Sequence, residues 1–330
     1  MNKVSQKDIA ESLNISRVTV TKALQDHPEI ARETIRKVKE RAQEMGYIPD
    51  FIGRSLSSNR TFTLGLVVPK IAHSFFSTSI EHMYEAARLK GYNLIPTVSF
   101  EDCDREFDNV KTLLSMRVDG IILDIAQNSK QNSSYELAVK AGCKVIFFDR
   151  CPSSFSGSSV LTDDREAAYR LCRMMLAKGY RKILHLAGPP YLNISEDRKR
   201  GYEDAMLEEE LPPWVIDVDL KKESGYNALK SLSEQGNLPE AIFAVNDPVA
   251  HGVYEAAKEL GIRIPVDMAV AGVGDVAASA MLSPPMTSIK PPIEQMAKAS
   301  VESLIHMIEN NKTESERQVF TSQVLIRSSI

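Results

Sequence analysis

The sequence predicts an all-α head followed by an α/β core of two parallel-sheet lobes. Three amphipathic patterns with apolar residues at helical spacing fill the first 48 residues. From Thr63 onward, short apolar runs rich in β-branched residues alternate with helical patterns. Because these roughly 270 residues exceed what one sheet normally needs, we expect two lobes with a cleft between them. The apolar runs are Leu64–Val68, Leu94–Val98, Gly120–Asp124, Val145–Asp149, Ile183–Ala187, Ile242–Val245 and Ala269–Ala271.

Two short helices separated by a three-residue break are predicted near the start of the chain. Ser5 stands three residues before Asp8, close to the capping-box pattern that begins a helix. Residues 14–16 interrupt the helical spacing, and Ser16 is a suitable N-cap for the second helix. A break of this length is typical of a helix-turn-helix. A third helix is expected over residues 31–45. The inward-facing residues are Ile9, Ala10, Leu13, Val20, Ala23, Leu24, Ile35, Val38 and Ala42.

The second helix carries the residues expected to read DNA. Arg17 and Lys22 can donate to guanine O6 and N7, and Val18 can contact a thymine methyl group. Smaller polar residues suit phosphates, which fix the register without reading the sequence. The predicted DNA-binding residues of the head are Ser5, Ser16, Arg17, Val18, Thr19, Thr21 and Lys22. The alternative is a three-helix bundle with a solvated charged face.

The charge of the chain is divided between its two parts. The net charge is −4, but residues 1–60 hold 11 Lys and Arg against 8 Asp and Glu, while the rest hold 29 against 36. A basic head on an acidic body agrees with a DNA reader that has a separate domain for another ligand.

Cysteine usage and hydropathy indicate a cytoplasmic protein without a membrane partner. Cys103, Cys143, Cys151 and Cys172 show no close pairing and are expected to be reduced thiols. No apolar run approaches the ~18 residues that a membrane span needs. The N-terminus has no apolar signal region, so we expect no secretory signal.

Several motifs resemble one known family of regulators. The segments K-D-I-A-E-S-L-N-I-S-R-V-T-V-T-K-A-L, G-Y-I-P-D at 46–50 and G-R-S-L at 53–56 are similar to those of the lactose/galactose-repressor family, and the likeness continues to about residue 330. The resemblance implies a core like periplasmic sugar-binding proteins and a role in transcription control. Repression is the expected output, because no activation surface is recognised in the sequence. It implies a DNA-binding domain at 1–48, a hinge at 49–61 and an effector-binding and dimerisation domain at 62–330. The first lobe is expected at about 62–161 and 291–318, and the second at about 162–290 and 319–330.

The hinge is expected to become ordered on DNA. An isolated segment of this length is too short to form a stable helix. The resemblance implies that Leu56 enters the minor groove at the centre of the site, where an apolar wedge kinks the duplex. Gly53 stands where the family usually has alanine, which weakens a helix by up to ~1 kcal/mol. Both residues join the predicted DNA-binding set. The alternative is a flexible linker whose leucine packs on the body.

The effector site is expected beyond the carboxyl ends of the strands. The resemblance implies that Asp149, Arg198 and Asn246 hydrogen-bond the effector and that Phe75 and Phe76 line the cleft. His73 and Asp275 complete the predicted effector-binding set. Charged and amide groups suit a polar ligand, such as a sugar or sugar derivative. Alternatively, Asp149 caps the next segment and Arg198 forms a lobe–lobe ion pair.

Three departures from the family pattern affect the expected effector. Gly274 replaces an acid that usually faces the ligand, so that only its neighbour Asp275 remains. Leu220 stands where an aromatic stacking ring is often found, and Leu192 and Ile194 are apolar where polar contacts are frequent. The effector is therefore expected to be less hydroxylated, bound differently or absent.

No enzyme motif is evident, and neither a cofactor nor a metal is expected. The chain lacks G-x-x-x-x-G-K-[ST], G-x-S-x-G and H-E-x-x-H, and its six histidines have no metal-binding spacing. A periplasmic solute-binding protein would share the body, but it would need a signal peptide and would lack the head.

A symmetric dimer on double-stranded operator DNA is predicted, since helix-turn-helix modules usually act in pairs. The first body helix, Ser77–Leu89, is the expected dimer face, with His82 and Tyr84 as candidates. The apolar stripe of the helix at 293–309 is expected to be core, and no leucine-heptad tail for tetramerisation is recognised. Effector binding is expected to shift the lobes and so the hinges. The alternative is control by a protein partner such as a phosphocarrier.

Overall fold

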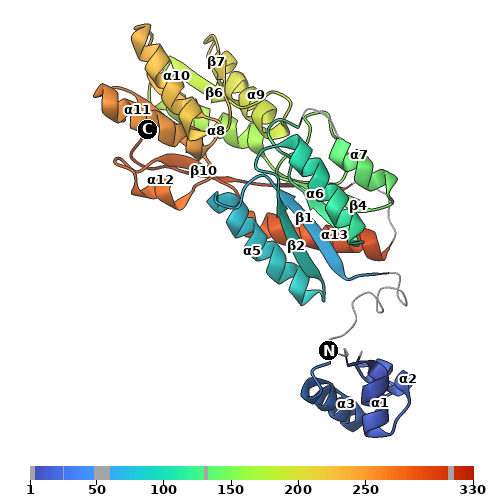
Figure 1. Cartoon of the computed structure of the whole chain (residues 1–330). Helices are drawn as coiled ribbons and strands as arrows, with labels where there is room; N and C mark the ends of the chain where they lie inside the picture. Colours follow the sequence, from blue (N-terminus) through green and yellow to red (C-terminus); the bar gives the residue numbers. More distant parts are fainter. Residues whose placement is uncertain (1–3, 25, 48–59, 130–132, 311–315) are drawn as a thin grey trace. The chain divides into compact units, whose positions relative to one another are not determined.

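The computed structural model describes residues 4–24, 26–47, 60–129, 133–310 and 316–330. The chain divides into two compact units, Met1–Thr61 and Phe62–Ile330. Figure 1 shows the helical head and the larger α/β body. The predicted fold class is confirmed, and each unit is described by itself. Within the described residues, no helix is both long enough and apolar enough to cross a membrane.

The head consists of three helices around a small apolar core. They are α1 (Gln6–Leu13), α2 (Arg17–Leu24) and α3 (Arg32–Glu44). The capping box is present, since Ser5 N donates to Asp8 Oδ2 at 2.7 Å and Asp8 N donates to Ser5 Oγ at 3.4 Å. Asn14 ends α1 in the left-handed region, which allows the turn into α2. The predicted inward-facing residues form this core.

The first lobe of the body is a six-stranded sheet in the order β11-β5-β4-β3-β1-β2, with all described pairs parallel. Side chains alternate along its strands, so Leu64 and Leu66 pack with α5 and α13, while Val67 packs with α6 and α7 on the other face. Its elements are β1 (Thr63–Val68), α5 (Ser74–Leu89), β2 (Asn93–Val98), α6 (Cys103–Ser115), β3 (Gly120–Leu123), α7 (Ser133–Lys140), β4 (Lys144–Phe148), β5 (Ser159–Thr162), α13 (Ile293–Glu309) and β11 (Arg317–Phe320).

The second lobe has the order β12-β10-β9-β8-β6-β7, and its pairs are parallel except for β10 with β12. Phe243 of β8 packs with α8 and α9, and its neighbour Ala244 packs with α10 and α11 on the other face. The elements of this lobe are α8 (Asp164–Ala177), β6 (Ile183–Ala187), α9 (Asn193–Glu208), β7 (Trp214–Asp217), α10 (Lys222–Glu234), β8 (Ala241–Ala244), α11 (Asp247–Leu260), β9 (Ala269–Val273), α12 (Ala277–Met281), β10 (Thr287–Lys290) and β12 (Gln323–Leu325).

The described chain passes between the lobes after β5, after β10 and after β11. Strand β11 continues to Phe320, two residues past the expected crossover at 318. Side chains also join the lobes. Gln127 Oε1 accepts from Leu220 N at 3.1 Å, and Asn193 Nδ2 donates to Asp149 O at 3.0 Å. These crossovers and contacts place the carboxyl ends of both sheets around a common space.

Candidate effector pocket and DNA-reading helix

A pocket of about 380 Å³ lies at the carboxyl ends of the strands of both lobes. This volume is at the lower end of the range for small-molecule sites, so it suits a small ligand. Six of the seven predicted effector-binding residues line it: His73, Phe75, Phe76, Asp149, Arg198 and Asn246.

Asp149 supplies the pocket with hydrogen-bond acceptors. It follows β4 with φ 58°, a conformation that aspartate tolerates better than most residues. The side chain is buried, yet no hydrogen bond from the described residues reaches its carboxylate. Burial raises the pKa of Asp149 to about 6, against the lowering effect of Arg198 and Arg150. It therefore does not cap the next segment.

Arg198 is held rigidly on two sides. Its Nε donates to Asp164 Oδ1 at 2.6 Å, and its Nη1 donates to Val245 O at 2.8 Å. Asp164 begins α8 at the first crossover and also accepts from Thr162 Oγ1 at 2.7 Å. The buried ion pair between Arg198 and Asp164 thus lies where the chain first crosses between the lobes. The Nη2 atom of Arg198 retains its donors for a ligand.

Asn246 is occupied by contacts within the protein. It is the N-cap of α11, where its Oδ1 accepts from Val249 N at 2.9 Å. Its Nδ2 donates to Leu220 O at 3.4 Å. It shapes the pocket wall and contributes fewer free donors and acceptors than the sequence predicts.

The start of α5 brings an aromatic cluster to the first-lobe side of the pocket. The rings of Phe75 and Phe76 meet edge to face with centroids 5.3 Å apart. The Arg150 guanidinium lies 5.3 Å from the Phe76 ring centroid and forms a 3.0 Å ion pair with Glu101. Burial and the nearby Arg150 lower the pKa of His73 to about 4, so its ring is neutral at pH 7.

Glu101 and Arg150 line the pocket but are not in the predicted effector-binding set. Arg150 directly follows Asp149 at the carboxyl end of β4, so its position was a usable signal. Its ion pair with Glu101 joins two loops 49 residues apart, and no local pattern reveals it.

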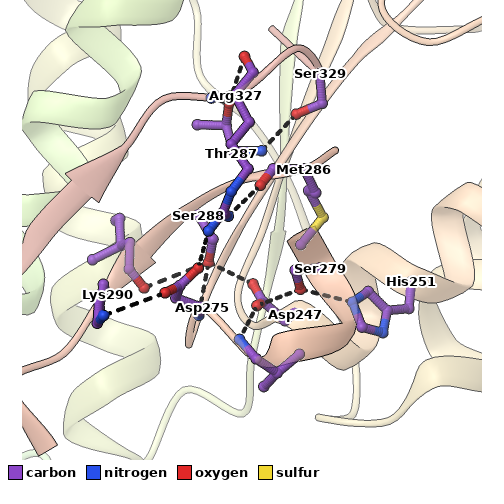
Figure 2. Close-up of polar contacts among 12 residues, drawn as sticks. Asp247, His251, Asp275, Ser279, Met286, Thr287, Ser288, Lys290, Arg327 and Ser329 are labelled. Atoms are coloured by element: carbon purple, nitrogen blue, oxygen red, sulfur yellow. Dashed lines mark hydrogen bonds and ion pairs between the residues drawn. The ribbon is translucent and has the colours of Figure 1, made fainter. Parts of the chain in front are cut away.

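Asp275 lies outside the pocket lining, unlike the other six predicted effector-binding residues. Figure 2 shows its carboxylate directed toward Arg327 and Lys290. Arg327 Nη2 donates to Asp275 Oδ1 at 2.5 Å, and Lys290 Nζ lies 3.9 Å from Oδ2. The turn after β9 is the physical reason that Asp275 lies away from the pocket. Gly274, at φ 130°, takes the place next to the pocket, and Asp275 N donates to Ser288 Oγ at 3.0 Å.

A second carboxylate, that of Asp247, accepts hydrogen bonds that hold the same turn. Asp247 accepts from Ser279 Oγ and Ser288 Oγ, each at 2.7 Å, and from Val276 N at 2.9 Å (Figure 2). The ring of His251 meets Ser279 Oγ at 2.8 Å. Although Asp, Ser and His meet here, Ser279 is fully buried and therefore inaccessible to a substrate. The cluster fixes the turn and α12 onto α11.

The head presents its predicted reading residues at the start of α2. Ser16, Arg17 and Val18 are exposed, and Val18 keeps 64% of its surface accessible. The other predicted residues have partners within the head. Ser5 belongs to the capping box, Thr19 contacts Ser16, Thr21 donates to Gln6, and Lys22 pairs with Glu29. Gly53 and Leu56 lie outside the described residues.

Two family models match the chain. Residues 5–50 match the model for bacterial regulatory proteins of the lacI family, and residues 172–330 match a periplasmic binding protein-like domain. The chain belongs to the LacI family of bacterial regulatory proteins. It is therefore a DNA-binding transcription regulator with a helix-turn-helix head and a periplasmic-binding-protein-like body.

Relatives of this LacI-family chain match it over nearly its whole length. It is 28% identical over 329 residues to the ribose operon repressor of Haemophilus influenzae, covering 99% of this chain and 98% of that protein. It is also 28% identical to the probable HTH-type transcriptional repressor ExuR of Bacillus subtilis, covering 99% and 98%.

Solved structures of the family show the same fold. The lac repressor dimer bound to operator and the anti-inducer ONPF has a TM-score of 0.86 at 21% identity, covering 99% of both chains. The complex of the regulator CelR with cellobiose has a TM-score of 0.75 at 23% identity, covering 99% and 100%.

Proposed function

We propose that this LacI-family chain is a cytoplasmic repressor without enzymatic activity. It binds a near-palindromic operator as a homodimer, and a sugar or sugar derivative in the pocket between its lobes controls it. The observation that carries the effector role is the buried Asp149 carboxylate, which lines the pocket without a hydrogen bond from the described protein groups. Buried polar groups require partners, and hydroxyl groups of a ligand supply them.

The exposed start of α2 supports the DNA-binding role. Arg17 and Val18 project from the first turn of the second helix, where the N-terminal residues of a recognition helix contact base edges. Ser16 and Thr19 lie beside them and suit phosphate contacts. Ser5, Thr21 and Lys22 are proposed to join these contacts, with Gly53 and Leu56 acting at the centre of the operator.

Selection of bound fragments from random DNA, at a stated salt concentration, tests the operator. The expected product is an approximate dyad with a central pyrimidine–purine step, because such steps unstack most easily. A bound pool without an enriched dyad would contradict the proposal.

Leu56→Ala tests the proposed wedge at the hinge. Without the leucine, the kink at the operator centre loses its apolar insert, so affinity for the selected operator should fall at least ~10-fold. Affinity for random DNA should change little, since phosphate contacts dominate it. Fluorescence anisotropy measures both, with the exposed Leu207→Ala as control. Equal losses on both DNAs would exclude the wedge.

The effector role is tested by thermal-shift screening of sugars and sugar derivatives followed by titration of the hit. Arg198→Ala should abolish its binding, because the donor beside Asp149 is lost. Arg198→Lys keeps a charge beside Asp164 and should fold normally, yet it cannot reproduce the fork of donors. Arg263→Ala, at an exposed ion pair with Asp267, is the matched control. Full affinity in Arg198→Lys would remove Arg198 from the site.

A further inference from the structure

The two lobes also meet where the loop after β4 passes the start of α9. Pro152 of the first lobe and Leu192 of the second lobe form an antiparallel β-bridge. Beside this bridge, Ser153 N donates to Tyr191 O at 3.0 Å. Hydrogen bonds are directional, so these contacts fix the two loops relative to each other. We call this contact between residues 149–153 and 191–193 the loop junction.

Asn193 forms three hydrogen bonds across the loop junction. It is the first residue of α9, where a backbone N–H has no partner inside the helix, and its N donates instead to Cys151 O at 3.1 Å. Its side-chain Oδ1 accepts from Cys151 N at 2.8 Å, and its Nδ2 donates to Asp149 O at 3.0 Å. The side chain is buried, so a broken bond here is not readily replaced by one to water.

The hydrogen bond to Asp149 attaches the backbone of a pocket residue to the second lobe. Asp149 N donates to Val160 O of β5 at 3.0 Å, within its own lobe, whereas its carbonyl is held by Asn193. Each side of this residue, at φ 58°, is therefore fixed by a different lobe. Loss of the second attachment lets Asp149 leave the left-handed region, which is unfavourable for residues other than glycine. The position of the carboxylate thus depends on Asn193, which is not itself part of the pocket lining.

Helix α9 carries both Asn193 and Arg198, so it fixes these two residues relative to each other. Arg198 is held in turn by Asp164 and by the carbonyl of Val245. The two groups proposed to bind the effector come from different lobes, since Asp149 follows β4 and Arg198 lies on α9. Asn193 connects them directly, because it belongs to the helix of one and binds the backbone of the other.

We propose that Asn193 is a positioning residue of the effector pocket, which holds the Asp149 carboxylate beside Arg198 only while the lobes stay joined at the loop junction. This inference rests on the proposed effector function and names the residue that links the pocket to the arrangement of the lobes. A movement that separates α9 from the loop after β4 breaks the bond to Asp149 O and releases that residue. A ligand that needs both Asp149 and Arg198 therefore favours the joined arrangement.

Alkylation by iodoacetamide, followed by mass spectrometry of the labelled peptides, tests the loop junction in the ligand-free full chain. Cys151 is 2% exposed in the junction, so it should react slowly in the wild type. Asn193→Leu keeps the side-chain size but removes both side-chain hydrogen bonds, and labelling of Cys151 should become at least ~10-fold faster. Cys172, in the core of the second lobe, should react as slowly as in the wild type. An unchanged rate at Cys151, or an equal increase at both cysteines, would overturn the proposal.

The gain in melting temperature that Asp149→Asn gives at neutral pH reports the burial of that carboxylate. The carboxylate lies among Arg150, Arg198 and Asp164, and burial raises its pKa to about 6. In the Asn193→Leu background the released carboxylate regains water, so its pKa should fall toward 3.8 and the gain should drop below about half of its wild-type value. A full gain in this background would show that Asp149 is held without Asn193.

Tyr202→Phe, on the same helix, is the matched control. Tyr202 Oη donates to Ile183 O at 2.7 Å and accepts from Trp214 N at 2.8 Å, all within the second lobe. This variant loses buried hydrogen bonds of α9 but leaves the loop junction intact. It should melt at a lower temperature, label Cys151 at the wild-type rate and keep the full gain from Asp149→Asn. If it changes both readouts as much as Asn193→Leu does, general weakening of α9 explains them and the proposal fails.

The fate of the proposed effector function is read separately, because neither measurement uses a ligand or DNA. If both readouts change as expected but thermal-shift screening finds no ligand, the hold of Asn193 on Asp149 is confirmed and the effector function fails. If a ligand binds and requires Arg198 while Asn193→Leu leaves both readouts unchanged, the positioning role fails and the effector function stands.

Discussion

Asp149 affects the stability of the fold, the pH dependence of that stability and the proposed binding of a ligand. Its carboxylate is buried among Arg150, Arg198 and Asp164. The two arginines are themselves committed to other carboxylates, so their attraction does not offset the loss of water, and the pKa rises to about 6. The site therefore holds an acid that is costly to ionise in the folded protein. Hydrogen bonds from a ligand would favour its ionised form.

Asp149→Asn should stabilise the ligand-free protein at neutral pH. The folded-state pKa of about 6 lies above the ordinary aspartate pKa of 3.8, so the folded protein binds the proton more tightly. Ionisation of Asp149 therefore lowers the free energy of unfolding. The loss grows as pH rises from about 4 to 6, reaches on the order of 3 kcal/mol at most above pH 6, and disappears as pH falls toward 4. Asparagine removes it, so the variant should melt several degrees higher than wild type at pH 7.5 and close to wild type at pH 4.5.

Thermal melts of both proteins across this pH range measure the difference. Asp217→Asn, at an exposed carboxylate at the end of β7, should show no such pH-dependent gain. A difference between Asp149→Asn and wild type that stays constant from pH 4.5 to 7.5 would contradict the assigned pKa.

At the scale of elements, glycines let paired helices touch backbone to backbone. A Cβ on Gly225 of α10 would lie 1.9 Å from Val249 O of α11, and one on Gly252 of α11 would lie 1.9 Å from Lys222 O. Leu220 and Asn246, which line the pocket, lie just before α10 and α11, so this close approach positions that part of the pocket.

Gly225→Ala should therefore lower the free energy of unfolding by about 1–3 kcal/mol, although alanine is the better helix former. The methyl group must separate two backbones, and a flexible side chain cannot move aside to accept it. Urea denaturation followed by circular dichroism measures the change, with the exposed Asn227→Ala on the same helix as control. Wild-type stability in Gly225→Ala would show that the two helices separate at no cost.

Periodicity predicts the longer apolar elements better than the shortest strands. The run Leu64–Val68 is found as β1, buried along its whole length, and the helix expected at 293–309 is α13. Strands β5, β7, β10, β11 and β12 are not among the predicted runs. Strands β7, β11 and β12 are short and partly exposed, whereas β5 and β10 are buried but only four residues long, so each leaves too short a pattern to be recognised.

Some residues of the site are positioned by the neighbouring sequence, and others are positioned by contacts with residues far away in the chain. The rule that ligands bind beyond strand ends places Asp149 correctly at the pocket, since its position follows from β4 alone. The direction of Asp275 depends on Arg327, which lies 52 residues later in the chain. Likewise, the loss of free donors at Asn246 depends on a contact with Leu220, 26 residues earlier. Such pairings arise from tertiary packing and leave no pattern in the neighbouring sequence.

At the scale of the whole molecule, a near-palindromic operator requires two copies of the chain related by a two-fold axis. Helix α5 of the first lobe, the predicted dimer face, packs beside β2, which is the edge strand of its sheet. It exposes Tyr84 and Leu89, which are 51% and 74% accessible. Large exposed apolar side chains on one helix, next to an edge strand, are typical of a protein–protein interface.

Tyr84→Asp should dissociate the proposed dimer. A two-fold interface contains the substituted residue twice, so the variant would desolvate two carboxylates without partners. At micromolar concentration, light scattering coupled to gel filtration should report a mass near the 36.7 kDa of one chain, against twice that value for wild type. Operator affinity should fall at least ~100-fold, because each head then binds its half-site alone. Leu207→Asp places the same charge at an exposed leucine of α9 and should leave both mass and affinity unchanged. A dimeric Tyr84→Asp variant with full operator affinity would move the interface away from α5.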